Sequence, residues 1–174
     1  MMIKMRLALA AVLRVHDFVS KVLYQLGVLA LGLIVIIFMY EILSRYFLNA
    51  PTRWASDFVT FLLLIKVFLV LPWLTRSGGN VAVTVLNDQL PERGRKFMFA
   101  SGYLIAAVIC LYLGYVVFLE TLTLHSRGTR TLSTVSIPRW ILYAFICYGL
   151  FNAGLYFLRL VVGKGAAESL EVNT

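Results

Sequence analysis

The sequence predicts an all-α membrane protein with four transmembrane helices. Of its 174 residues, 61% are hydrophobic and 14% are charged, and the mean hydropathy is +0.88. Soluble domains contain about half apolar residues and about a quarter charged ones, so this composition excludes an ordinary soluble domain. A helix needs about 20 mostly apolar residues to cross the hydrocarbon core of a bilayer. Four stretches meet that requirement, at residues 23–43, 54–74, 97–119 and 140–162.

The basic residues act as topology signals. About ten of them precede the first span, lie between the second and third, or follow the fourth, against about five in the other two links. Since cytoplasmic links carry the excess of Lys and Arg, both termini and the middle link are predicted to be cytoplasmic. The net charge of +8 does not indicate nucleic-acid binding, because no dense basic patch with interleaved aromatic residues is present.

Residues 1–22 are predicted to form an interfacial amphipathic helix, lying on the cytoplasmic leaflet before the chain turns into the membrane. Arg14, Asp17 and Lys21 fall on one helical face after a short apolar stretch. A signal peptide is the alternative, and it is disfavoured because Arg14 interrupts the apolar core and a full span follows at once. Residues 163–174 are small and polar and are predicted to form a disordered cytoplasmic tail.

The link between the first two spans contains candidate interface residues. Glu41 and Arg45 are four positions apart with the acid first, the favourable order for an ion pair on a helix. Pro51 predicts a tight turn, so the two spans should be antiparallel neighbours. The second helix should then begin with Thr52 as its N-cap and Trp54 in the headgroup layer.

Two polar residues near the middle of their predicted spans are further candidate interface residues. Lys66 is about 18 Å below Trp54 at the helical rise of about 1.5 Å per residue, so it needs a partner or a path along which its amine can reach water. No acid of this chain is predicted at its depth. Asn152 is the one strongly polar interior residue of the fourth span, and we expect it to bond a neighbouring helix rather than a ligand.

The sequence lacks the residues that common catalytic, cofactor and metal sites require. His16 and His125 lie outside the predicted spans, and neither nucleotide-binding, metalloprotease nor serine-hydrolase motifs occur. Cys110 and Cys147 have no paired spacing and read as buried hydrophobic residues. Repeated halves and broken helices, typical of a self-contained transporter, are also missing. We therefore expect no enzyme and no cofactor, but an accessory membrane subunit.

The central part of the chain resembles a known family. The order of residues 45–51 (RYFLNAP), 54–57 (WASD), 76–80 (RSGGN) and 90–91 (LP) is similar to the small, DctQ-type membrane subunit of tripartite ATP-independent periplasmic (TRAP) transporters. The four-span layout agrees over nearly the whole chain. The chain departs from the family pattern at Ser56, Ile65, Lys66, Val70, Asn80 and Thr84.

The resemblance implies a bacterial inner-membrane component of a sodium-coupled uptake system. A periplasmic binding protein would capture the solute, and a large membrane subunit would carry it across by an elevator-like motion. The small subunit would brace the stationary part of that partner. Solutes of the family are mostly carboxylates, including dicarboxylates and sialic acids. Arg45, Arg53 and Asp57 would then fix the outer end of the first helical hairpin, and Lys66 would face the large subunit.

Two other function classes remain open on the sequence. One is an autonomous exporter or channel, in which Glu41, Asp57 and Lys66 line an ion path through a homo-oligomer. The other is a small four-helix membrane enzyme, which the scattered ionisable residues argue against. Association with a much larger membrane protein, rather than a stable assembly of identical chains, would distinguish the leading hypothesis from the first alternative.

Overall fold

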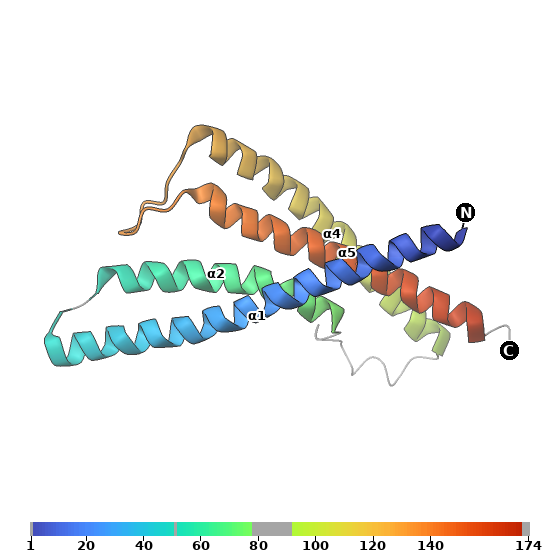
Figure 1. Ribbon diagram of the computed structural model, residues 1–174, viewed down its shortest axis with the longest axis horizontal. Helices are drawn as coiled ribbons and strands as arrows, with labels where there is room; N and C mark the ends of the chain where they lie inside the picture. The colour runs from blue at the N-terminus through green and yellow to red at the C-terminus, as the bar shows by residue number, and fades with distance from the viewer. Residues whose placement is uncertain (1, 51, 78–91, 172–174) are drawn as a thin grey trace.

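Four long helices make up the protein, as the sequence predicted. The computed structural model describes residues 2–50, 52–77 and 92–171. Its helices are α1 (Met2–Leu48), α2 (Arg53–Arg76), α4 (Glu92–Arg127) and α5 (Arg139–Glu171) (Figure 1). Each one contains an apolar segment long enough to cross a membrane. In the described residues the extended pairing is limited to an isolated bridge between Arg130 and Pro138. The all-α, four-span fold class is confirmed.

The helices pack side by side in the order α1, α2, α5, α4. α1 contacts α2, α2 contacts α5, and α5 contacts α4, so α2 and α5 are central and α1 and α4 are outer. The links α1–α2 and α4–α5 share one end of the bundle, called here the loop end (Figure 1). Many large apolar side chains of α1 and α4 are exposed. In water such a surface would drive aggregation, whereas lipid or a membrane partner covers it without cost.

Two glycines of α5 let the helices approach closely. A Cβ added at Gly149 would lie 2.6 Å from the Phe68 carbonyl oxygen of α2. A Cβ added at Gly154 would lie 2.9 Å from Leu111 Cδ2 of α4. Since the hydrophobic effect does not hold helices together in lipid, close van der Waals contact at small residues does so instead. The two glycines therefore position α5 between its neighbours.

The turn between α1 and α2 is as tight as Pro51 predicted. Asn49 adopts a positive φ of 49°, the left-handed conformation that commonly ends a helix. The Ala50 N–H then donates to the Ser44 carbonyl at 3.3 Å, and the Ser44 hydroxyl donates to the Ala50 carbonyl at 2.8 Å. Thr52 occupies the N-cap position of α2, but its side chain makes no capping hydrogen bond. The N-cap position itself is as predicted.

The predicted change of direction after residue 22 is also wrong. α1 continues without interruption from Met2 to Leu48. Neither Pro nor Gly occurs in the sequence before Gly27, so nothing interrupts the backbone hydrogen bonds there. In addition, Asp17 faces the other helices and pairs with two arginines. How residues 1–22 lie relative to a bilayer stays a prediction.

Two helices extend further than the apolar stretches indicated. α5 reaches Glu171, so the disordered tail predicted from residue 163 is wrong. α4 reaches Arg127, and the link that was expected to begin near Glu120 is confined to residues 128–138. A hydropathy window reports the part of a helix that lipid can cover, whereas the helix itself continues wherever its residues favour it. Residues 78–91, which carry part of the family resemblance, lie outside the described residues.

Candidate functional site

Three helices meet around the carboxylate of Asp17. The Arg159 Nη1 of α5 lies 2.6 Å from Asp17 Oδ1, and the Arg76 Nη2 of α2 lies 3.1 Å from Asp17 Oδ2. The Tyr156 hydroxyl also donates to Oδ1, at 3.0 Å. Only 18% of the Asp17 side chain is exposed. We call this group the Asp17 centre, and its members are His16, Asp17, Arg76, Asn152, Tyr156 and Arg159.

His16 extends the Asp17 centre through a fixed hydrogen bond to α5. The Asn152 Nδ2 donates to the Tyr148 carbonyl at 2.7 Å, which leaves the Asn152 Oδ1 as an acceptor. His16 Nε2 lies 2.7 Å from that oxygen and must therefore carry a hydrogen. The His16 ring also packs on Tyr156, with ring centroids 4.6 Å apart. Asn152 thus bonds a neighbouring helix.

Aromatic rings support the two arginines of the Asp17 centre. The Arg76 guanidinium lies 4.8 Å from the centroid of the Trp73 ring, and the Arg159 guanidinium lies 5.2 Å from that of Tyr156. Both distances are within the range of a cation–π interaction. Trp73 in turn contacts Tyr24 of α1, at 5.9 Å between centroids. The centre is thereby held by ion pairs, hydrogen bonds and ring contacts among α1, α2 and α5.

Sequence reasoning placed Asp17 on a solvated helix face and missed its partners. Arg159 is 142 positions away, too far for any spacing rule. One signal was available: Arg159 falls inside the fourth predicted span, 140–162, and a charge there needs a partner. Since Asp17 is the acid nearest the start of the first span, the two could have been matched.

A second interhelical contact lies at the loop end. The Val135 N–H of the α4–α5 link donates to Asp57 Oδ2 of α2 at 3.1 Å. The link is held in shape by its own hydrogen bonds, because Thr131 Oγ1 accepts from the Ile137 N–H at 3.0 Å and donates to the Val135 carbonyl at 3.2 Å. Asp57 therefore joins α2 to a link that is held in one conformation by its own hydrogen bonds.

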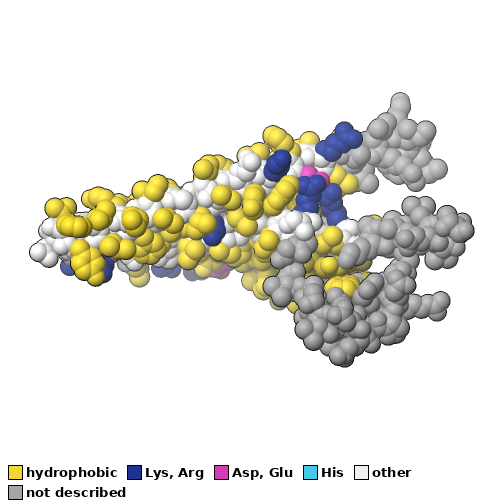
Figure 2. Space-filling view, turned by 90° about the horizontal axis from the view of Figure 1, so that it is seen from below, with side chains coloured by type: hydrophobic (Ala, Val, Ile, Leu, Met, Phe, Trp, Pro, Cys, Tyr) yellow, Lys and Arg dark blue, Asp and Glu magenta, His cyan; other side chains and the backbone are white. Residues whose placement is uncertain are grey.

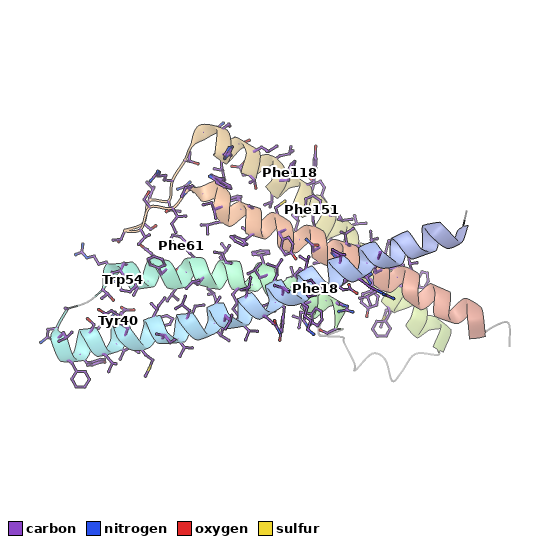
Figure 3. All side chains as sticks on the ribbon, in the orientation of Figure 1. Phe18, Tyr40, Trp54, Phe61, Phe118 and Phe151 are labelled. Atoms are coloured by element: carbon purple, nitrogen blue, oxygen red, sulfur yellow. The ribbon has the colours of Figure 1, made fainter. Side chains whose placement is uncertain are left out.

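The other loop-end residues selected from the sequence lie on α1 and α2. Glu41 and Arg45 form an ion pair across one helical turn, with Glu41 largely buried. Trp54 packs beside Tyr40 of α1, with ring centroids 5.9 Å apart (Figure 3). It also contacts Phe58, at 5.8 Å between centroids. Arg53 is exposed and has no ion pair or hydrogen bond within the part of the chain that the structure describes.

Lys66 is half-buried on α2. Among the described residues, neither an ion pair nor a side-chain hydrogen bond involves its amine. The structure therefore brings Lys66 together with neither Glu41 nor Asp57, whose carboxylates are bound to Arg45 and to the Val135 N–H.

An apolar groove of about 470 Å³ is formed where α1, α2 and α5 meet. Its lining is apolar apart from the Tyr148 hydroxyl, which is buried without a hydrogen-bond partner. The residues that line it are Leu23, Leu69, Trp140, Ile141, Ala144, Phe145 and Tyr148. Within the described ranges, no three His, Cys, Asp or Glu residues converge as metal ligands. The carboxylate of the Asp17 centre is bound by two arginines and a tyrosine, and it serves a structural role in joining the helices.

Comparison with known proteins agrees with this picture of a membrane subunit. Residues 34–164 match the family described as "Tripartite ATP-independent periplasmic transporters, DctQ component". The chain is also 22% identical over 149 residues to the ectoine TRAP transporter small permease protein TeaB of Halomonas elongata, an alignment that covers 84% of this chain and 77% of the relative. Because the family match spans most of the chain and the four apolar helices agree with it, this protein belongs to the DctQ family of TRAP transporter small permease subunits and is a multi-pass protein of the bacterial inner membrane.

Proposed function

We propose that this chain braces the large membrane subunit of a TRAP transporter during sodium-coupled, binding-protein-dependent uptake of an organic acid. The observation that supports this function best is the pair of ties between its helical hairpins. Asp57 holds the α4–α5 link at the loop end, and Asp17 holds Arg76 and Arg159 at the other. Helices that are fixed to one another at both ends resist separation and sliding. An elevator-like partner requires this rigidity of its stationary part.

The exposed faces of the two outer helices provide the area for such a partner. α1 packs mainly on α2, with a smaller contact to α5 at the Asp17 centre, and α4 packs mainly on α5. Most of the large apolar side chains of α1 and α4 remain exposed in the described residues. Lys66, half-buried and without a polar partner among the described residues, would face polar groups of the large subunit. An ammonium within a span is tolerated where a partner protein or a hydrated path receives it.

The loop end would face the periplasm and the binding protein. Arg45 and Arg53 are exposed there, and Leu132 at the tip of the α4–α5 link is 96% exposed. A folded link with an exposed apolar side chain presents a fixed contact point rather than a mobile one. Asp57 would act indirectly, by holding the link in place.

The solute would be selected by the other components. The relative from Halomonas elongata is named for ectoine, but the identity is 22%. In this chain the polar groups of the Asp17 centre are bound to one another, and the groove is lined almost entirely by apolar side chains. Neither feature offers the paired donors that recognition of a carboxylate needs. An organic acid is proposed as the solute class, and the binding protein would recognise it.

Co-purification and reconstitution test the proposal. We expect the chain, co-expressed with the large subunit, to purify with it in a one-to-one ratio. Vesicles containing both should take up solute only when the binding protein and a sodium gradient are supplied. Vesicles containing this chain alone should show no flux. Solute flux through the chain alone, together with a stable homo-oligomer, would instead establish the autonomous exporter or channel.

A further inference from the structure

The Asp17 centre lies within a cluster of positive charge. The cluster contains Arg76 of α2 and Arg159 of α5, and on α1 Arg14 and Lys21 lie about one helical turn before and after Asp17. Asp17 is bound to Arg76 and Arg159. Arg14 and Lys21 are exposed and have no ion pair within the described parts of the chain. Among the described residues, these four cations and the Asp17 carboxylate leave an excess of three positive charges.

The two unpaired cations flank Asp17 on the same face of α1. They precede and follow it by three and four residues, hence about 5 and 6 Å along the axis at the helical rise of about 1.5 Å per residue. Neighbours three and four apart share one helix face. Figure 2 shows acidic side chains with Lys and Arg beside them toward the end of the bundle opposite the loop end, next to a largely apolar surface.

The cluster lies at the level where a membrane ends. Arg76 is the last residue of α2, whose whole length is apolar enough to span. Trp73, which contacts Arg76, and Tyr24, which contacts Trp73, are residues that favour the headgroup layer. Basic groups between spanning helices at this depth are suited to the negative charge of phosphate headgroups.

We propose that Arg14, Lys21, Arg76 and Arg159 bind the phosphate of an anionic phospholipid in the leaflet at this end. Asp17 fixes the guanidinium groups of Arg76 and Arg159, and Arg14 and Lys21 supply the charge that Asp17 does not neutralise. The lipid chains would then lie along the exposed apolar surface of α1 toward the loop end, where Val22, Leu26 and Leu29 are exposed.

Titration with phosphatidylglycerol tests the proposal. The purified full-length chain is placed in neutral detergent, and lipid binding is measured by native mass spectrometry, with phosphatidylcholine as the neutral comparison. The variant Arg14→Gln/Lys21→Gln removes two charges without touching the Asp17 ion pairs. Because each basic residue near a surface contributes about fivefold in affinity, the double variant should bind phosphatidylglycerol roughly 25-fold more weakly.

A matched variant separates a site from general attraction. Arg53→Gln/Arg127→Gln removes the same charge from exposed residues at the loop end and should bind as the wild type does. Equal losses in both variants, or unchanged binding in Arg14→Gln/Lys21→Gln, would overturn the proposal. Displacement of the lipid by millimolar inorganic phosphate would also overturn it, since the site would then bind free phosphate. Circular dichroism checks that each variant is folded.

Discussion

Asp17 of α1 and Arg159 of α5 are joined by two contacts, at 2.6 Å from Arg159 Nη1 to Asp17 Oδ1 and at 3.4 Å from Nη2 to Oδ2. The two nitrogens of one guanidinium thus meet both oxygens of one carboxylate. Such a paired arrangement fixes orientation as well as distance. With Arg76 on the second oxygen, this single carboxylate ties α1 to both α5 and the end of α2.

Replacing Asp17 by Asn should destabilise the protein. The change leaves two partly buried guanidinium groups without a counter-ion, and we expect a loss of about 1–3 kcal/mol in the free energy of unfolding, less than for a fully buried pair. Thermal unfolding of the purified chain in detergent measures it. Glu120→Gln, at an exposed acid of α4, removes the same charge and should leave the melting temperature unchanged. Equal melting temperatures for the Asp17→Asn variant and the wild type would contradict the structural role of the centre.

Two tyrosines of α5 should respond in opposite ways to loss of the hydroxyl. The Tyr156 hydroxyl donates to Asp17, so Tyr156→Phe should cost about 1 kcal/mol of stability. The Tyr148 hydroxyl is buried and has no hydrogen-bond partner among the described residues, so Tyr148→Phe should be neutral or stabilising. Chemical unfolding of the two variants under one condition compares them. A larger loss for Tyr148→Phe than for Tyr156→Phe would show that the hydroxyl assignments are wrong.

Adding a methyl group at Gly149 should separate α2 from α5. The new Cβ would lie 2.6 Å from the Phe68 carbonyl oxygen, which belongs to the backbone and cannot move aside alone. We expect Gly149→Ala to cost about 1–3 kcal/mol by overpacking. Gly102→Ala is the control, because no atom lies within 4 Å of its added Cβ and alanine favours a helix. Thermal unfolding should therefore show a lowered melting temperature only for Gly149→Ala.

Removal of the Asp57 carboxylate should release the α4–α5 link. In Asp57→Ala the Val135 N–H loses its acceptor, so its amide hydrogen should exchange faster with solvent. The Thr131 N–H donates to the Ile137 carbonyl at 2.9 Å within the link and should keep its protection. Hydrogen exchange resolved to single amides distinguishes the two. Equal acceleration of exchange at both amides would mean that Asp57 maintains the fold of the whole link. If exchange is accelerated at neither amide, Asp57 does not hold the link.

Uptake measurements on the same variant connect the link to transport. If a fixed link contributes to docking of the binding protein, Asp57→Ala should lower uptake in cells several-fold while the amount of assembled complex stays the same. The exposed residue Thr60 has its hydroxyl bound within α2, and Thr60→Ala serves as a control that should transport normally. Normal uptake by Asp57→Ala would exclude the link from the transport cycle.

Local features of the chain were predictable because short-range rules govern them. Apolar length alone fixed the four helices, since backbone groups in lipid must be satisfied within their own segment. The Glu41–Arg45 pair follows from helical spacing, and the tight turn at residues 49–52 follows from Pro51. The family resemblance in residues 45–91 likewise rested on short motifs that follow one another along the chain, and the family match confirmed it.

The tertiary structure decided which distant polar groups meet. Asp17 and Arg159 pair because α1 crosses α5, and Asp57 reaches Val135 because the α4–α5 link folds over α2. Both contacts depend on the helix order α1, α2, α5, α4, which apolar spans of similar length leave undetermined. Tertiary contacts also decided how α1 is oriented on the N-terminal side of residue 22. The charges of this helix face alone indicated exposure to water, but the partners of Asp17 hold the face against α2 and α5.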